Sequence, residues 1–138
     1  MNLETFTKVM NVFPSFQPFI HIFHKNGSNI LNKMIEVANF SWKQEIKYIE
    51  CATADCSDIN NFIKNNEKDI PFTIIISEFH KANKDLSSTI IKEFFFNYQT
   101  NFAPNTHIVI LENKNDETYD NTYIDPYVSD KFSNFSID

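Results

Sequence analysis

Polar residues that could do chemistry follow two strongly apolar runs of the sequence. Ser77 and Glu78 come directly after the run at 72–76, and Asn113 lies two residues after the run at 107–111. Continuous β-branched runs are typical of buried parallel strands, and ligands bind beyond the carboxyl ends of such strands. A glutamate placed there can act as a general base. Ser77, Glu78 and Asn113 are therefore the first candidates for a functional site.

A second candidate is the turn that follows the apolar run at 19–23. It contains the chain's only glycine and precedes a helical pattern, and its candidate residues are His24, Lys25, Gly27 and Ser28. A strand, a glycine turn and a helix make up a phosphate-binding loop, in which backbone N–H groups, a lysine and a hydroxyl hold phosphate and Mg²⁺. In register with the motif G-x-x-x-x-G-K-[ST], Ile30 replaces the lysine and Leu31 replaces the hydroxyl. We expect this nucleotide site to be vestigial, and Lys25 reaching a phosphate from another direction is the alternative.

The strand end at Ser77 lacks the carboxylate with which a nucleoside triphosphatase binds Mg²⁺. Without a metal or a phosphate, Glu78 has nothing to activate, so we interpret it as a helix-end or ion-pair carboxylate. The four histidines form no evident ligand set, and the sequence shows no nucleophile elbow. We therefore expect no catalytic residues, no cofactor, no metal site and no enzyme activity.

The composition limits the partners of the chain. All twelve basic residues are lysines, the formal net charge is −6 and the isoelectric point is about 5.1. An acidic chain without arginine lacks the planar guanidinium that clamps phosphates, and it repels nucleic acid. Abundant Phe, Ile, Asn and Lys indicate an AT-rich genome. Nucleic-acid binding is therefore not expected.

Cysteine usage and hydropathy indicate a reducing, intracellular compartment. Cys51 and Cys56 have a spacing that fits neither a redox C-x-x-C pair nor, with only two thiols, a zinc site. We expect one buried thiol at a strand end and one in the next loop. No stretch resembles a membrane span, a signal peptide or an organelle presequence. The chain is accordingly expected in the cytoplasm or inside an organelle or virus assembly.

Hydrophobic periodicity predicts an alternation of strands and helices along the chain. Residues 1–17 are expected to form an N-terminal amphipathic helix, and residues 18–138 an α/β domain. The expected strands are 19–23, 45–51, 72–76, 107–111 and 135–137, with helices between them. Right-handed crossovers then give a three-layer αβα sandwich with a mostly parallel five-stranded sheet, as in P-loop NTPase cores.

Several local features carry more specific expectations. The helix at 30–38 should direct Ile30, Leu31, Met34, Ile35 and Ala38 inward. Ser57 or Asp58 should cap the next helix. The Phe-rich face of the helix after Leu86 should be core. Asp125-Pro126 should open a short helix that ends near Lys131, and the acidic segment 112–125 should be a solvated loop.

The second half of the sequence resembles the AAA+ ATPases, and within them the MoxR-like group. The run Phe-Thr-Ile-Ile-Ile-Ser-Glu-Phe-His-Lys-Ala at 72–82 looks like the family's Walker B strand, and 102–113 looks like the strand that ends in the sensor-1 Asn. Residues 116–132 resemble the motif in which a Leu-Asp-Pro-Ala-type helix leads to Asp-Arg-Phe. The resemblance covers about residues 18–138.

The resemblance implies roles for individual residues. Glu78 would be the water-activating residue and Asn113 the sensor, and Lys131 stands where the family has the Arg that acts across a subunit boundary. Ile30, Leu31 and Ser77 replace the Walker A Lys, the Walker A Ser/Thr and the Walker B Asp. The helical lid domain is expected to be absent. These replacements predict a degenerate core that does not hydrolyse nucleotide, as in the non-hydrolysing subunits of clamp loaders.

The preferred hypothesis is therefore a catalytically inactive structural or interaction subunit of a larger assembly. Its expected partner is another protein, such as an active AAA+ ATPase or a large phage or organellar complex, contacted through the N-terminal helix or the acidic segment 112–125. One alternative is an unconventional nucleotide-binding protein or NTPase that uses Lys25, Glu78 and Asn113. Another is a replication accessory of clamp-loader type, which would show salt-dependent DNA binding.

Overall fold

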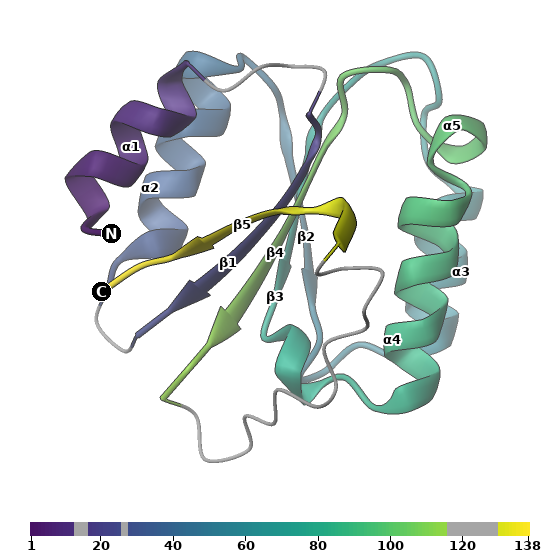
Figure 1. Ribbon diagram of the computed structural model, residues 1–138. Coiled ribbons are helices and arrows are strands. Elements are labelled where there is room, and N and C mark those ends of the chain that lie inside the picture. Colours follow the sequence, from purple (N-terminus) through teal and green to yellow (C-terminus); the bar gives the residue numbers. More distant parts are fainter. Residues whose placement is uncertain (13–16, 26–27, 116–129) are drawn as a thin grey trace.

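The computed structural model describes residues 1–12, 17–25, 28–115 and 130–138, and its centre is a parallel five-stranded sheet (Figure 1). The strand order is β2-β3-β4-β1-β5, and every neighbouring pair is parallel. This is the predicted sheet, although β5 begins two residues earlier than expected. The strands are β1 (Phe19–His24), β2 (Ile46–Glu50), β3 (Thr73–Ser77), β4 (His107–Asn113) and β5 (Ser133–Ser136).

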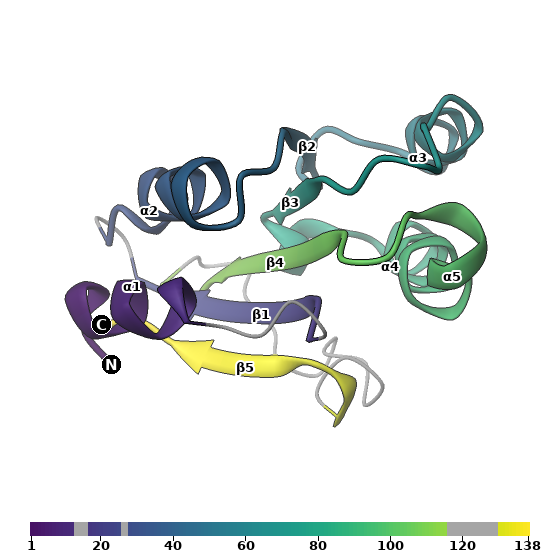
Figure 2. The same ribbon diagram turned by 90° about the horizontal axis from the view of Figure 1, so that it is seen from above.

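Helices cover both faces of the sheet, which confirms the three-layer αβα sandwich (Figure 2). On one face lie α1 (Leu3–Asn11) and α2 (Ile30–Glu36), the latter extended by a π-helical turn, Val37–Ser41. On the other lie α3 (Cys56–Lys64), α4 (Lys84–Ile91) and α5 (Tyr98–Asn101), with a π-helical turn, Lys92–Phe96, between the last two. A short 3₁₀ turn, Phe79–Lys81, follows β3.

Each face of the sheet has its own apolar core, because alternate residues of a strand point to opposite faces. In β4, Ile108 and Ile110 pack with α3 and α4, whereas Val109 and Leu111 pack with α1 and α2. Phe94 of the Phe-rich helix is fully buried in the first of these cores. The prediction that this helical face is core, rather than a binding surface, is confirmed.

The N-terminal helix contributes its apolar side to the second core. Phe6 and Met10 are both fully buried, and the ring of Phe6 makes an edge-on contact with Phe135 at 5.6 Å between centroids. The apolar face of this helix therefore belongs to the core, and docking of a partner through the helix stays a prediction.

The capping of α3 differs from the expectation. The N-cap is Asp55, whose carboxylate accepts from the backbone N–H of Asp58 at 3.0 Å. The Asp58 carboxylate in turn accepts from the N–H of Asp55 at 2.9 Å. Such a reciprocal capping box satisfies two backbone donors at once, so the helix begins earlier than a cap at Ser57 or Asp58 would allow.

A buried ion pair links β1 and β4 and corrects the interpretation of the acidic segment. Glu112 is only 3% exposed and belongs to β4, where Oε2 lies 2.7 Å from Nε2 of His21. Nδ1 of His21 lies 3.0 Å from Oδ1 of Asn134 in β5. Glu112 is therefore part of the sheet rather than of a solvated loop. Residues 116–129, with the expected Asp125-Pro126 cap, lie outside the described residues.

Candidate functional site

Strand register brings most of the predicted candidates to one edge of the sheet. Ser77 at the end of β3 pairs with Glu50 at the end of β2, and Asn113 at the end of β4 pairs with His24 at the end of β1. Glu78 follows Ser77, and its negative charge acts to raise the pKa of His24. The carboxyl edge is therefore the candidate site, as the strand ends predict.

Glu78 occupies a left-handed backbone conformation, with φ 53° and ψ 41°, immediately before the 3₁₀ turn. This conformation is uncommon for residues other than Gly and Asn. The turn brings Lys81 back onto Glu78, with Nζ 3.2 Å from Oε1. The Glu78 carboxylate is thus held in an ion pair, as expected, and the 3₁₀ turn sets its position relative to Lys81.

The second partner of Glu78 is Glu50, which sequence reasoning missed. A hydrogen bond between the two carboxyl groups raises the pKa of Glu50 and lowers the pKa of Glu78, with Lys81 adding to the latter effect. Glu50 is thus the carboxyl that takes the proton first. The strand-end rule, applied also to β2, would have found this residue.

We expect Glu78→Gln to lower the pKa of Glu50 towards the ordinary value of a glutamate. The substitution removes the negative neighbour whose hydrogen bond favours the protonated form of Glu50. Carboxyl ¹³C chemical shifts followed through a pH titration measure this change, with Glu36 as an internal reference. An unchanged Glu50 titration would show that the two carboxyl groups do not interact.

Beside this pair, a pocket of about 190 Å³ lies between the end of β1 and the start of α2. The residues that line it are His24, Lys25, Ser28, Asn29, Ile30, Leu31 and Asn113. Lys25 is exposed there, whereas Ile30 is 3% exposed and belongs to the core. Leu31 is 40% exposed, so the expectation that it points inward is wrong. It sits on the pocket side of α2 because Ile30, Met34 and Val37 already form the buried stripe.

The polar groups of this pocket are largely engaged with one another. Asn113 Oδ1 accepts from the backbone N–H of Asn115 at 2.9 Å. Nδ1 of His24 lies 3.4 Å from both the Lys25 carbonyl oxygen and Ser28 Oγ, and burial lowers the pKa of this histidine. His24 is consequently a neutral ring at physiological pH rather than a cation for phosphate.

The remaining candidates do not join the site. Lys131 borders Phe19 and Ser133, where β1 and β5 begin, so it lies at the opposite edge of the sheet from Glu78. Gly27 lies outside the described residues. Among the residues that the structure describes, no three His, Cys, Asp or Glu side chains are placed to hold a metal ion. In the same residues, no helix is long and apolar enough to span a membrane.

The two cysteines are both free thiols. Cys51 is buried just after β2, and burial raises its pKa to about 12, which makes it a poor nucleophile. Cys56 is the first residue of α3 rather than part of a loop, and its sulfur accepts from Thr89 Oγ1 at 3.4 Å.

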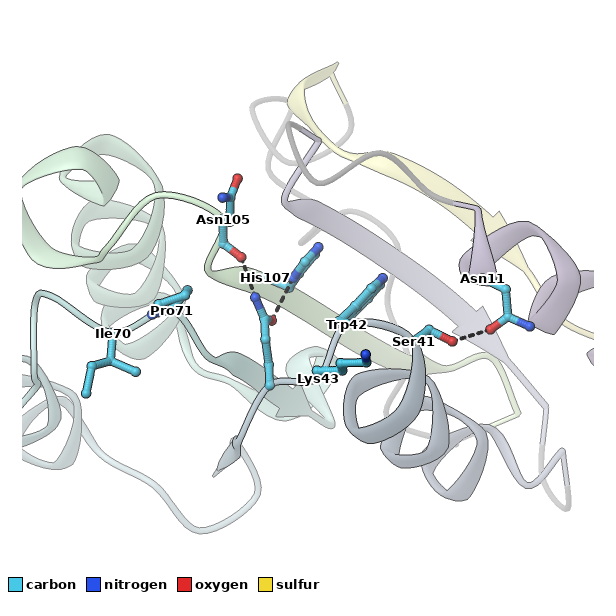
Figure 3. Close-up of a pocket in the computed structure, with 9 residues that line it drawn as sticks. Asn11, Ser41, Trp42, Lys43, Ile70, Pro71, Asn105 and His107 are labelled. Atoms are coloured by element: carbon cyan, nitrogen blue, oxygen red, sulfur yellow. Dashed lines mark hydrogen bonds between the residues drawn. The ribbon is translucent and has the colours of Figure 1, made fainter.

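A larger pocket, of about 660 Å³, lies at the amino edge of the sheet (Figure 3). The rings of Trp42 and His107 stack there at 3.8 Å and 4°. Gln44 links three sides of this pocket. Its Oε1 accepts from Thr73 Oγ1 and faces His107 Nδ1, each at 2.8 Å. Its Nε2 donates to the Asn105 carbonyl at 2.7 Å. Gln44 thereby fixes the proton of His107 on Nδ1.

His107 should make the fold sensitive to acid. Burial lowers its pKa from 6.5 to about 4, so the unfolded chain takes up the proton first as the pH falls. The full free energy of unfolding is therefore present above pH 6.5. Between pH 6.5 and pH 4 the neutral ring should cause it to fall by about 3 kcal/mol. Urea unfolding of the wild type and His107→Gln across this range measures the difference. Parallel pH profiles for the two proteins would contradict the assignment.

Solved structures with the same fold were found, whereas no family model and no curated protein matches the sequence. The RuvB Holliday junction branch migration motor of Thermotoga maritima superposes with a TM-score of 0.66 and 10% identity, over 99% of this chain and 45% of that protein. A DNA polymerase III gamma subunit-related protein of the same organism superposes with a TM-score of 0.57 and 13% identity, over 100% of this chain and 46% of that protein.

This chain therefore spans less than half the length of the solved proteins that it resembles. Identities of this size establish the fold alone. The strand order, the parallel register and these superpositions agree that the chain has the α/β fold of P-loop NTPase and AAA+ cores.

Proposed function

We propose that this chain is an AAA+-like subunit that does not hydrolyse nucleotide and that acts through association with other proteins. The observation that carries the proposal is the start of α2 beside the 190 Å³ pocket. The position that needs a lysine holds Ile30, which is buried, and the position that needs a hydroxyl holds Leu31, whose methyl groups line the pocket. Neither side chain can neutralise a phosphate or bind Mg²⁺.

The charge of the carboxyl edge supports the same proposal. Ser77 supplies no carboxylate for Mg²⁺, and Glu78 is already held by Lys81 and Glu50. The charge of Glu78 acts on His24 of the pocket, so it repels a triphosphate bound there, and the chain has no arginine to offset this repulsion. A transferring phosphoryl group would find little of the electrostatic stabilisation that its hydrolysis requires.

Titration calorimetry with ATP, ADP and GTP in the presence of Mg²⁺ tests this proposal, together with a phosphate-release assay. We expect neither binding at micromolar nucleotide nor turnover above the rate of buffer alone. Lys25→Ala is the informative variant because Lys25 lines the pocket, and Lys33→Ala is its control because Lys33 pairs with Glu36 instead. Micromolar binding that Lys25→Ala abolishes and Lys33→Ala preserves would establish the unconventional nucleotide-binding alternative.

Association with other proteins is the second half of the proposal. We also propose that the chain is similar to the MoxR-like group of AAA+ proteins. This part of the proposal rests on the sequence motif that ends at Lys131 and Phe132. The free thiols support a reducing, intracellular compartment for the assembly. A tagged chain recovered from its native extract alone, with a monomeric mass in light scattering, would count heavily against an assembly role.

A replication accessory of clamp-loader type is the second candidate function, favoured by the fold shared with the gamma subunit-related protein. It predicts DNA binding whose affinity falls steeply with salt. Fluorescence anisotropy with single- and double-stranded oligonucleotides at two salt concentrations distinguishes this replication role from the protein-binding role. The net charge of −6 favours the protein-binding role.

A further inference from the structure

The two edge strands of the sheet, β5 and β2, differ in whether other backbone pairs with their outer side. At the β5 edge, the backbone of Met1 pairs with the chain end, because its amino group donates to the Ser136 carbonyl at 3.2 Å and its carbonyl accepts from Asp138 N–H at 3.0 Å. At the β2 edge, no described strand lies beyond β2 (Figure 2). Unpaired edge strands are templates for pairing with another chain.

The hydrogen bonds at the two ends of β2 show which backbone groups face outward. Glu45 O accepts from Thr73 N–H at 2.9 Å, and Cys51 N–H donates to Ser77 O at 3.0 Å. In a parallel ladder alternate residues bond the same neighbour. The odd-numbered residues therefore bond β3, and Ile46, Tyr48 and Glu50 direct their N–H and C=O groups outward. The Glu50 carbonyl is taken by the following turn, whereas the others have the spacing of a strand-pairing edge.

A groove of about 240 Å³ runs beside this edge, between β2 and α3. Its floor is formed by Ile49 and Ile59, which are buried, and Phe62 lines it from α3. On the other face of β2, Tyr48 is 56% exposed. An added strand would alternate its side chains between these two apolar contacts, because successive residues point to opposite faces.

The rim of the groove is acidic. Glu50 and Asp58 line it, and Asp55 caps α3 next to them. Lys47, the lysine of the strand, lies over the rings of Phe72 and Phe62, with its Nζ 4.0 and 5.7 Å from their centroids, so it offsets only part of this charge. The charge that a partner meets at this edge is therefore negative, and a chain of net charge −6 is poorly suited to pairing with its own copy.

We propose that an extended, basic segment of a partner protein adds to the outer edge of β2 as a sixth strand. Backbone hydrogen bonds to Ile46 and Tyr48 give it affinity, the groove beside α3 takes its alternate apolar side chains, and Glu50 and Asp58 select lysine or arginine. This inference rests on the proposed function in that it names the chemistry of one partner segment.

The probe is a labelled nine-residue peptide of alternating lysine and valine, with alternating glutamate and valine as its control, titrated by fluorescence anisotropy. Tyr48→Pro is the informative variant. It removes an outward N–H without removing a bond to β3, and proline is tolerated on such an edge. Tyr48→Ala is the matched control because it keeps the N–H. We expect Tyr48→Pro to weaken binding at least about tenfold beyond Tyr48→Ala.

Amide exchange on the wild-type protein decides the question independently of any variant's folding. With saturating basic peptide, the amides of Ile46 and Tyr48 should become protected, and Glu50→Gln should weaken the binding. Equal binding of the acidic peptide, unchanged exchange at β2, or a dimer of this chain that pairs through β2 would each overturn the proposal. None of these measurements involves nucleotide. A negative result for strand pairing can therefore be told apart from a result that refutes the proposed function, which would be ATP hydrolysis.

Discussion

His21→Leu is expected to lower the free energy of unfolding by about 3–5 kcal/mol, the cost of leaving one member of a buried ion pair without its partner. His21 is fully buried and Glu112 is 3% exposed. Both ring nitrogens of His21 face oxygen acceptors, since Asn134 Nδ2 donates to the Phe132 carbonyl at 2.9 Å and so turns Oδ1 towards the ring. The ring therefore lies between the Glu112 carboxylate and Asn134, and each of its nitrogens contacts an oxygen of one of them.

The double variant His21→Leu/Glu112→Leu is the matched test, because it removes both polar side chains of the pair and leaves neither without a partner. Replacing a buried pair by apolar side chains is commonly neutral or stabilising. We expect urea denaturation to show that the double variant recovers most of the stability lost in each single variant. Lys33→Ala, which breaks an exposed pair with Glu36, should cost less than about 1 kcal/mol. Additive losses in the double variant would show that the two side chains are not coupled.

The pair also shows where prediction from the sequence fails. Glu112 begins an acidic stretch, and local composition favours a solvated loop. Its burial depends on His21, which lies 91 residues earlier in the chain and becomes its neighbour only through the parallel β1–β4 register. The strand-end rule could have placed Glu50 at the carboxyl edge, but its hydrogen bond with Glu78 arises only from the pairing of β2 with β3. Contacts across strands cannot be obtained from local pattern alone.

The fold itself was predictable because its signals are local. The buried strands are β-branched runs such as 72–76 and 107–111, and helix-length connections between them require right-handed crossovers and hence a parallel sheet. Strand ends then placed Ser77, Glu78 and Asn113 at one edge, as the structure shows. The helix cap was predicted too late, at Ser57 or Asp58, because the N-cap Asp55 acts as a reciprocal pair with Asp58.

The inward face of α2 illustrates a limit of periodicity. Residues 30 and 31 are adjacent apolar residues, and a helix can bury only one of them in its central stripe. The structure buries Ile30 and leaves Leu31 at the pocket. The absence of a phosphate-binding lysine follows from the sequence, but the position of Leu31 at the pocket follows only from the fold. The lack of hydrolysis remains a prediction that the nucleotide experiments decide.

Phe94→Ala is expected to destabilise the protein by about 3–5 kcal/mol, whereas Phe96→Ala two residues later should cost less than about 1 kcal/mol. Phe94 is fully buried and stacks on Phe102 at 5.3 Å between centroids, so truncation removes buried apolar surface and leaves a cavity. Phe96 is 64% exposed. The comparison holds the residue type, the substitution and the helical segment constant.

Urea or thermal denaturation of the two variants measures the contrast, and circular dichroism checks that each is folded at the start. If Phe94→Ala unfolds the chain outright, Phe94→Leu gives a smaller loss that can still be quantified, because leucine refills much of the cavity. Similar losses for Phe94→Ala and Phe96→Ala would contradict the placement of the Phe-rich face in the core. A large loss confined to Phe94→Ala, with Phe96 tolerant, would leave Phe96 as a side chain that the fold itself does not require.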